Sequence, residues 1–410
     1  MTTVSTHLPA TRVRSATYAT YAAFMGSGVA LASWAARIPQ VRDGLSLSPS
    51  ALGLVLLSMA VGSIIALPLS GWVIARFGAR RAVQVMAVLL AVGMVVIALG
   101  YVFGLVPVVL GLFLFGFANG TWDVGMNVQG ALVERHLGRS IMSRFHAGFS
   151  LGTVAGALVG AAMVALEVPV TAHLLVVALV VGVSVPLAAR HFLSEDAGEA
   201  DASDAADAEP PAQGRRALAA WREPRTLLVG VVVLAFAFAE GAGNDWISVA
   251  VIDGYHAPAA LGTLAFAAFL AAMTTTRWFG PALLDRYGRV LVIRVLALAG
   301  IVGLLLFVFG PTTPVAFAGA LLWGVGVSLG FPVGMSAGAD DERMAPARVS
   351  VIASIGYCAF LAGPPLIGFL GDRVTVLRAL TSVAVLLGLA ALVAGAVHPL
   401  EQDLEAPEGH

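Results

Sequence analysis

Long apolar runs separated by short polar segments dominate the chain. Because about 20 apolar residues cross a bilayer as a helix, the runs predict twelve membrane-spanning helices. They lie near residues 17–36, 50–74, 82–101, 106–133, 142–166 and 170–189, and then near 226–252, 258–283, 290–309, 313–338, 348–370 and 374–397. The runs are continuous and about twice as long as the alternating strands of a membrane barrel. The pattern therefore predicts an all-α polytopic membrane protein.

The composition supports this fold class. Apolar residues make up 59% of the 410 residues and charged residues only 11%, whereas soluble domains carry about 25% charged residues. This excludes a cytosolic enzyme and a disordered protein, and a net charge of −1 excludes the basic footprint of a nucleic-acid binder. No nucleotide-binding loop, metal-ligand cluster or nucleophile–base pair is found. We therefore expect the bilayer as the surroundings, no cofactor, no metal and no enzymatic activity.

The arginines predict the orientation of the helices. All 23 basic residues are arginine. Eighteen of them lie at the helix ends on the side of the N-terminus, whereas the opposite side carries Arg37, Arg42, Arg373 and Arg378. Arg277 belongs to neither set, because it lies inside the eighth predicted helix. An excess of arginine marks the cytoplasmic side, so both termini are expected in the cytoplasm.

A polar segment divides the chain into two halves. Residues 194–214 are rich in alanine and contain seven carboxylates between Glu195 and Glu209, a composition that cannot form a core. We expect an N-terminal six-helix bundle at 1–193, an acidic cytoplasmic linker at 194–224, a C-terminal six-helix bundle at 225–400 and a tail at 401–410. The linker is interpreted as a tether, with a regulatory role as the alternative.

The two halves repeat one another in sequence. Arg76-Phe77-Gly78 corresponds to Arg286-Tyr287-Gly288, and Val124-Gly-Met-Asn127 corresponds to Val333-Gly-Met-Ser336. The matches occur in one order at a nearly constant offset, from about 212 residues to about 207. A parallel repeat of two six-helix bundles predicts a solute site near the membrane midplane between the halves.

One motif points to a family. The segment Asp285-Arg286-Tyr287-Gly288-Arg289, with its counterpart beginning at Gly71, resembles the Gly-x-x-x-Asp-Arg-x-Gly-Arg-Arg loop of the major facilitator superfamily. Segments 119–127 and 145–149 resemble the bacterial fucose-permease-like branch and its uncharacterised inner-membrane members. The resemblance implies twelve helices in a 6+6 arrangement and a monomeric secondary transporter of the bacterial inner membrane that works by alternating access.

The same loop suggests a gate. Ala75 replaces the carboxylate expected in the first half, and Pro281 replaces the glycine expected in the second. We therefore expect a one-sided cytoplasmic lock centred on Asp285, with Arg144 as its partner. The other basic residues assigned to this gate are Arg76, Arg286 and Arg289. The alternative is a permanent ion pair that only sets the topology.

Polar residues inside the apolar runs are candidates for the solute site, because ionisable groups at membrane depth are costly and are kept for function. Asp123 lies near the middle of the fourth run, with Asn119 and Asn127 one turn away on the same face and Trp122 beside it. We assign these four residues to solute binding, and Asn244, Tyr357 and Trp323 with them. The alternative for Asp123 is a hydrogen-bonded contact between helices.

Glu240 and Arg277 lie within the seventh and eighth runs. Arg277 requires a carboxylate partner at this depth, and both Glu240 and Asp123 are candidates. Asp123, Glu240 and Arg277 are assigned to proton coupling, with structural pairing as the alternative. The residues Gly241-Ala-Gly243 predict a break in the seventh helix.

The leading interpretation is a proton-coupled transporter of a small polar solute, with a sugar or sugar derivative favoured. A drug or metabolite exporter working by proton antiport is the alternative, and a non-transporting sensor on the same fold is the third.

Overall fold

The structure is a computed structural model that describes residues 9–138, 141–193, 218–341 and 343–400. Within these ranges the chain is helical and contains no β-strand. Most of the expected acidic linker, residues 194–217, and the expected tail at 401–410 lie outside the described residues.

Each half of the chain forms its own set of helices. The first half contains α1 (Ala10–Ala35), α2 (Ile38–Gly44), α3 (Pro49–Phe103), α4 (Leu105–Leu137), α5 (Met142–Ala165) and α6 (Val170–Ala189). The second half contains α9 (Pro224–Tyr255), α10 (Ala259–Tyr287), α11 (Arg289–Phe309), α12 (Thr313–Val327), α13 (Gly330–Gly338), α14 (Ala345–Val374), α15 (Val376–Ala379), α16 (Thr381–Val393) and the 3₁₀ helix η2 (Ala394–Val397).

These helices account for the twelve predicted spans. In the described part of the chain, ten helical segments are long and apolar enough to cross a membrane. One of them, α3, has 55 residues and contains two predicted spans joined at a kink. The helix α1 has 26 residues and matches the first predicted span. In the part of the chain that the structure describes, the fold is therefore that of an all-α membrane protein with twelve spanning helices.

Two glycines end the second and the eighth span in the same way. Gly78 has φ 76° and ψ 152°, and Gly288 has φ 74° and ψ 160°. Residues with a Cβ rarely adopt this positive φ. The kink within α3 and the boundary between α10 and α11 are thus the same feature in both halves, as the sequence repeat predicts.

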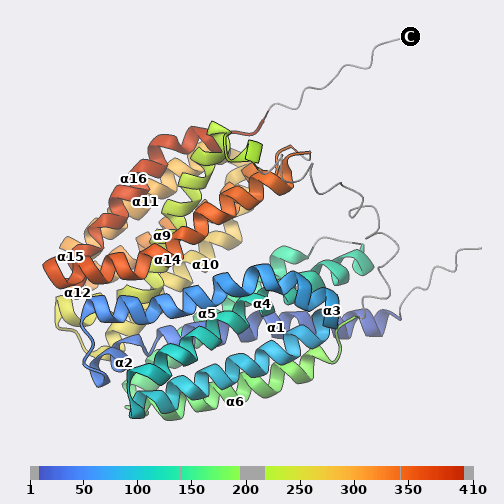
Figure 1. Cartoon of the computed structure of the whole chain (residues 1–410). Coiled ribbons are helices and arrows are strands. Elements are labelled where there is room, and N and C mark those ends of the chain that lie inside the picture. Colours follow the sequence, from blue (N-terminus) through green and yellow to red (C-terminus); the bar gives the residue numbers. More distant parts are fainter. Residues whose placement is uncertain (1–8, 139–140, 194–217, 342, 401–410) are drawn as a thin grey trace, which may run out of the picture.

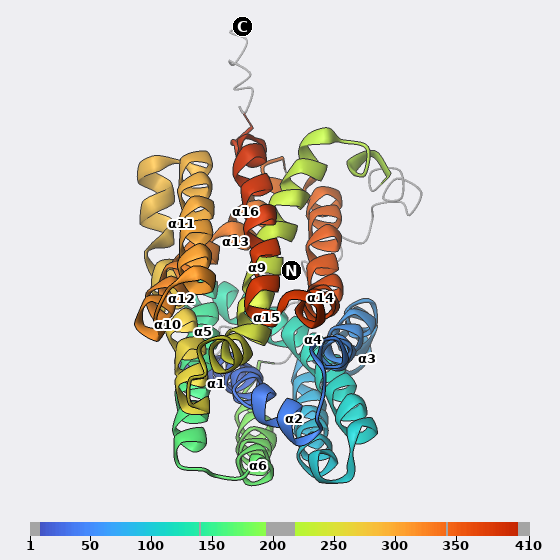
Figure 2. The same cartoon turned by 90° about the vertical axis from the view of Figure 1, so that its left-hand side faces the viewer.

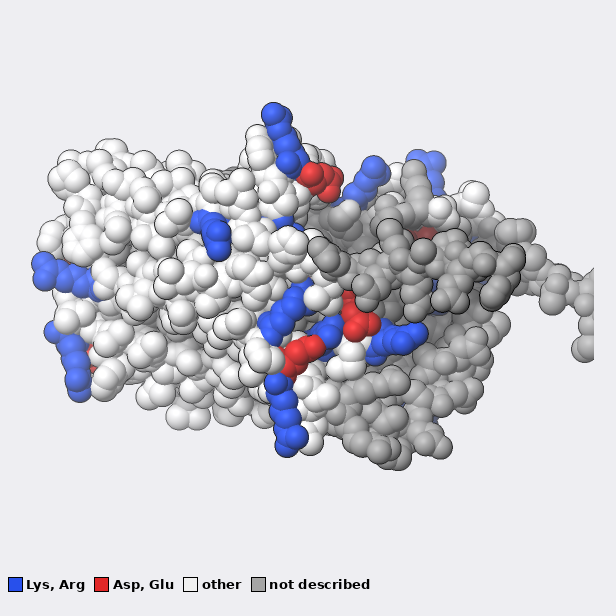
Figure 3. All heavy atoms as spheres, turned by 90° about the horizontal axis from the view of Figure 1, so that it is seen from above, with Lys and Arg blue, Asp and Glu red and all other residues white. Residues whose placement is uncertain are grey.

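The two halves lie close together at one end and diverge towards the other (Figures 1 and 2). The close end carries α2 and α15, and we call it the α2 end. The opposite end carries the start of α1 and the end of η2, and we call it the terminal end. The halves meet where α3 packs against α14 and where α5 packs against α10. In the view of Figure 3, most of the described surface is uncharged, as a lipid-facing surface requires.

The seventh span differs from its prediction. The helix α9 runs unbroken from Pro224 to Tyr255, so the expected break at residues 241–243 is wrong. A break occurs instead in the tenth span, where Ser328 and Leu329 separate α12 from α13. Its consequence for the solute site is described below.

Candidate functional site

A cavity of about 340 Å³ lies between the two halves. Its walls come from α1, α3, α4 and α5 on one side and from α9, α10 and α14 on the other. Six of the residues predicted for solute binding or proton coupling line it, and these are Asn119, Asp123, Glu240, Asn244, Arg277 and Tyr357. Residues more than 200 positions apart in the sequence thus meet in one cavity, as the parallel repeat predicts.

Arg277 and Glu240 form an ion pair on the cavity wall. Arg277 Nη2 donates a hydrogen bond to Glu240 Oε2 over 2.7 Å. Arg277 Nε also donates to the carbonyl oxygen of Ser328 over 2.9 Å. That carbonyl is available because α12 ends just before it, so the break in the tenth span supplies an acceptor to the guanidinium. The sequence left two carboxylates as candidate partners of Arg277, and the structure pairs Arg277 with Glu240.

Asp123 faces the cavity from α4 together with one of its two asparagine neighbours. The Oδ1 atom of Asn119 accepts a hydrogen bond of 2.8 Å from Ser27, which orients its amide group. Asn127 does not line the cavity. Its Nδ2 atom donates to the backbone carbonyl of Asp123 over 2.8 Å and to its carboxylate over 3.4 Å. Asn127 thus positions Asp123, whereas Asn119 is available to a solute.

Two predicted tryptophans lie away from the cavity. Trp122 and Trp323 are fully buried at 0% exposure and do not line the cavity wall. Trp323 packs edge-on against Phe269, with ring centroids 5.4 Å apart, and against Phe307 at 5.7 Å. The aromatic residues that do line the cavity include Tyr357, Phe149, Phe238, Phe266 and Phe360. The four phenylalanines were missed, because a phenylalanine in an apolar helix has no distinguishing sequence signal.

Asn244 and Asp245 add two polar groups to the same wall. The Oδ1 atom of Asn244 is buried and has no hydrogen-bond partner. Asp245 lines the cavity and forms no ion pair with any residue that the structure describes. Buried polar atoms normally have partners. An unpartnered acceptor on a cavity wall therefore marks a position where a solute can bind.

Contacts between the halves close the cavity at the α2 end. Arg42, in α2, pairs with both carboxylate oxygens of Asp253, in α9, and its Nη2–Oδ1 distance is 2.9 Å. The backbone N–H of Ser50 donates to Asp372 over 3.3 Å. A Cβ atom added to Gly53 would lie 2.5 Å from the carbonyl oxygen of Pro364. These contacts hold α2 and α3 directly against the second half.

The residues predicted for the gate lie at the terminal end, and the structure does not pair Asp285 with Arg144. Both side chains belong to exposed residues, and neither forms an ion pair within the described ranges. Arg76 lies over the ring of Phe77 at 5.6 Å from its centroid. Arg286 lies over the ring of the residue that follows it, Tyr287, at 5.2 Å.

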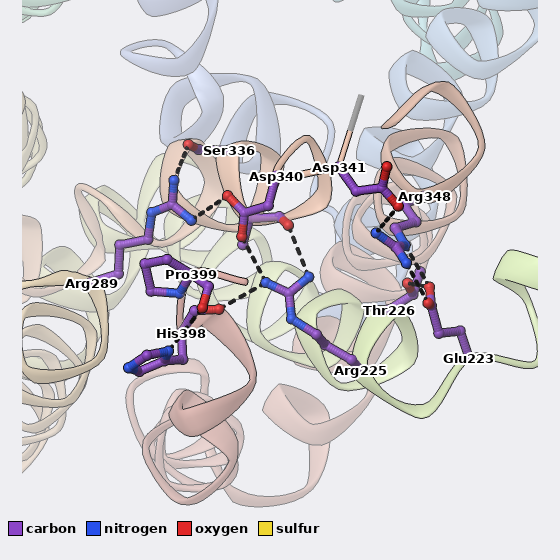
Figure 4. Close-up of polar contacts among 11 residues, drawn as sticks. Glu223, Arg225, Thr226, Arg289, Ser336, Asp340, Asp341, Arg348, His398 and Pro399 are labelled. Carbon is purple, nitrogen blue, oxygen red and sulfur yellow. Dashed lines mark hydrogen bonds and ion pairs between the residues drawn. The ribbon is translucent and has the colours of Figure 1, made fainter. Parts of the chain in front are cut away.

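Arg289 belongs instead to a charged network within the second half (Figure 4). It pairs with Asp340 over 2.7 Å and bonds to Ser336, and Asp340 also pairs with Arg225 over 2.8 Å. We call the set of Glu223, Arg225, Arg289, Asp340, Asp341 and Arg348 the terminal network. It ties α9, α11 and α14 to the segment that follows α13.

The other part of the terminal network surrounds Arg348. Its guanidinium donates to both carboxylate oxygens of Glu223, over 2.7 and 2.6 Å, and to Asp341 over 3.2 Å. The hydrogen bonds from Arg348 hold the pKa of Glu223 below its ordinary value. Among the described residues, the ion pairs at the terminal end join helices of the second half to one another and none crosses to the first half.

Comparisons with known proteins agree with this architecture. The family model of the Major Facilitator Superfamily matches residues 15–342. An uncharacterised transporter of Sinorhizobium fredii, y4wD, is 31% identical over 375 residues, which cover 91% of this chain and 96% of that protein. The crystal structure of the nucleoside transporter NupG superposes with a TM-score of 0.74 at 14% identity, covering 94% of this chain and 98% of NupG.

The fucose:proton symporter FucP of E. coli superposes with a TM-score of 0.61 at 15% identity, covering 93% of this chain and 98% of FucP. At these identities the two structures support the fold alone, whereas the family match and the Sinorhizobium relative cover most of the sequence. The chain belongs to the major facilitator superfamily of membrane transporters.

Proposed function

We propose that this chain is a proton-coupled secondary transporter of a small polar solute, with a sugar or sugar derivative favoured, in the bacterial inner membrane. The observation that carries the proposal is the cavity between the halves, which combines Asp123 of the first half with the Glu240–Arg277 pair of the second. Solute sites of such transporters lie near the midplane at the interface of their repeats. A monomer contains this whole site, and each six-helix half acts as one moving body.

The orientation follows from the arginines. The sequence assigns eighteen arginines to the side of the N-terminus and four to the opposite side, which favours the terminal end as the cytoplasmic one. The halves meet at the α2 end through Arg42 and Asp253 and diverge at the terminal end (Figure 1). The arrangement then corresponds to an inward-facing state, closed to the periplasm, in which a lock between Asp285 and Arg144 has separated.

Proton coupling is assigned to Glu240, Arg277 and Asp123. When a proton binds Glu240, the carboxylate loses its charge and its attraction for Arg277 weakens. The guanidinium is then available to Asp123 or to an oxygen of the solute. Because a protonated Glu240 and a freed Arg277 arise together, proton binding and solute binding are linked in free energy.

The solute-binding surface consists of Asn119, Asp123, Asn244 and Tyr357, and the cavity's apolar wall surrounds it. Amide and carboxylate groups among aromatic rings suit a hydroxylated ring that offers polar edges and an apolar face. The solved relatives with the same fold include a nucleoside transporter and a fucose:proton symporter, and their named substrates support a polar solute here. Export by proton antiport is the second candidate, because Asp123 and Asp245 lie on the wall without a cationic partner.

The test is transport in proteoliposomes with a panel of labelled sugars and sugar derivatives, with and without an imposed pH gradient. The gradient is expected to drive accumulation of at least one solute. Asp123→Asn should abolish this transport while expression and folding stay intact. Glu167→Gln is the matched control, because Glu167 is an exposed residue of the loop after α5, outside the cavity. Transport at the wild-type rate by Asp123→Asn would remove that residue from the site.

A further inference from the structure

The cavity carries more negative than positive groups. Among its described lining residues, three are carboxylates, Asp123, Glu240 and Asp245, and one is a guanidinium, Arg277. Arg277 is paired with Glu240. Asp123 and Asp245 therefore have no cationic partner on the wall.

One cationic candidate outside the wall, His146, interacts electrostatically with Asp123, whereas no charged group of the described residues does so with Asp245. His146 belongs to α5. Its Nδ1 atom lies 3.1 Å from the carbonyl oxygen of Met142, the ring contacts Phe24, and the residue does not line the cavity. Tyr357, the remaining titratable group of the wall, can add only a negative charge. Asp245, at membrane depth, thus requires a proton or a cation from outside.

A neutral group on the same wall independently requires a donor. The buried Oδ1 atom of Asn244 has no hydrogen-bond partner, and the sequence places this residue beside Asp245. Asn119 Oδ1, by contrast, already accepts from Ser27. The buried unpartnered atom on the second half's wall is therefore an acceptor, and a solute that binds there must offer it a donor. An ammonium group has three donors and no acceptor.

The volume of the cavity fits a small organic molecule. About 340 Å³ falls within the range of roughly 300–1,000 Å³ that small-molecule sites occupy. Among the described residues, no group of three or more histidine, cysteine or acidic side chains is arranged to hold a metal ion. Aromatic side chains such as Phe149 and Phe360 line the rest of the wall, where they can cover a carbon frame or face a cation.

We propose that the transported solute is a primary amine on a hydroxylated frame, of the amino-sugar class, whose ammonium group binds at Asp245, beside the unpartnered Oδ1 atom of Asn244, in place of a proton. This proposal rests on the proposed transport function and specifies its substrate. In this bound state Glu240 is ionised, so its pair with Arg277 is neutral as a unit and can contact the hydroxyl groups. Asp245 then holds either a proton or the ammonium group, so its negative charge is compensated in both cases.

Competition between amine and proton follows directly. An ammonium that binds a protonated carboxylate displaces a proton to water, and a proton that binds displaces the amine. Binding of the amine should therefore release protons and become tighter as the pH rises. Besides Asp245, the titratable groups that can contribute to this dependence are Asp123, Glu240, Arg277 and Tyr357 on the cavity wall, and His146, which interacts electrostatically with Asp123.

The experiment measures binding to the purified full-length protein in detergent. D-glucosamine, D-galactosamine and D-mannosamine are compared by calorimetry with their parent hexoses and their N-acetyl derivatives. At least one hexosamine should bind about tenfold or more tightly than its neutral counterparts, a difference that corresponds to one charge-assisted contact. A pH indicator in weakly buffered solution should report proton release on mixing.

Two variants test whether Asp245 binds the ammonium group. Asp245→Asn should remove most of the preference for the amine and most of the proton release, whereas Glu167→Gln should leave both unchanged. If the hexoses or the N-acetyl sugars bind as tightly as the amines, the substrate proposal is overturned while the transport function stands. The same holds if no hexosamine binds. Failure of the transport function is detected separately, by proteoliposomes in which the pH gradient drives no solute of the panel.

Discussion

Arg277 Nη2 lies 2.7 Å from Glu240 Oε2, and this ion pair joins α10 to α9 inside the cavity. The two side chains are 26% and 20% exposed, so the pair is neither fully solvated nor sealed from water. The guanidinium keeps a second acceptor, the carbonyl of Ser328, at 2.9 Å. An arginine with two partners can lose one of them without becoming unpaired, which suits a group that exchanges partners during transport.

Replacing one member of this pair should reduce both stability and coupling. Glu240→Gln leaves Arg277 without a carboxylate and is expected to lower the free energy of unfolding by about 1–3 kcal/mol, less than for a fully buried pair because water reaches both groups. Proton-driven accumulation should be lost while solute exchange down its gradient persists. The measurements are thermal unfolding in detergent and paired uptake and exchange assays in proteoliposomes.

The double variant Glu240→Gln with Arg277→Gln separates the two effects. Because it removes the unpaired charge, it should recover part of the lost stability, and the double-mutant cycle should show a coupling energy of about 0.5–3 kcal/mol. It should not recover proton-driven accumulation. Normal accumulation in either variant would exclude the pair from the coupling step.

The ion pairs at the two ends predict opposite shifts in conformation. Asp253→Asn weakens the contact with Arg42 at the α2 end, so it should favour the state in which that end is open. Asp285→Asn removes the carboxylate of the expected lock at the terminal end, so it should favour the state described here. Accessibility of single cysteines placed beside Arg42 and beside Arg144, probed with a membrane-impermeant reagent, measures both shifts. Changes of the same sign in both variants would contradict opposing gates.

The terminal network predicts a specific dependence of stability on pH. Hydrogen bonds from Arg348 lower the pKa of Glu223 below its ordinary value of 4.5, and the Glu223 side chain is 31% exposed. A lowered pKa means that the carboxylate stabilises the fold above pH 4.5 and that this contribution is lost as the pH falls through the lowered pKa. We expect a contribution of about 1 kcal/mol or less, because the group is partly solvated.

Comparison with Glu223→Gln isolates this contribution from that of other carboxylates. The variant should unfold at a lower temperature than the wild type at pH 7, and the difference should disappear as both are acidified below the range in which carboxylates titrate. Thermal unfolding followed by circular dichroism measures it. A difference that stays constant down to the lowest pH would show that Glu223 contributes packing and not charge.

The sequence predicts the helices well because the backbone N–H and C=O groups of each span must form their hydrogen bonds within that span when it lies in the bilayer. An apolar run of the right length leaves the chain few alternatives to a spanning helix, and the arginines mark which ends share a side. The cost of an unpaired charge at membrane depth likewise predicts that Arg277 needs a carboxylate, and the structure pairs it with one of the two candidates. Asn119, Asp123, Asn244 and Tyr357 stand out for the same reason, as polar groups in apolar runs.

The features that the sequence did not predict depend on contacts between distant segments, which the local sequence pattern does not contain. Trp122 and Trp323 occur in apolar helices, where a tryptophan that faces a cavity and one that faces a neighbouring helix have the same sequence signal. The Arg42–Asp253 contact joins residues 211 positions apart in segments that look like ordinary loop ends. The continuity of α9 through Gly241 and Gly243 shows that surrounding contacts outweigh the low helix propensity of glycine.

Gly53 provides a direct test of the closed α2 end. The glycine allows α3 to approach α14 so closely that a Cβ atom would lie 2.5 Å from the carbonyl oxygen of Pro364 and 3.1 Å from the Cα atom of Pro365. Both neighbours are backbone atoms, which cannot move aside as a flexible side chain would. Gly53→Ala should therefore push the two helices apart and shift the population away from the described state, towards one that is open at the α2 end.

Gly388→Ala is the matched control, because the structure places nothing within 4 Å of a Cβ added at Gly388 in α16. In Gly53→Ala, a cysteine near Arg42 should react faster with an impermeant reagent applied from the α2 side, and solute transport should slow because one of the alternating states is disfavoured. Gly388→Ala should match the wild type in both assays. If Gly53→Ala reacts and transports like the wild type, the contact between α3 and α14 does not close this end, and the closure must rest on Arg42 and Asp253 instead.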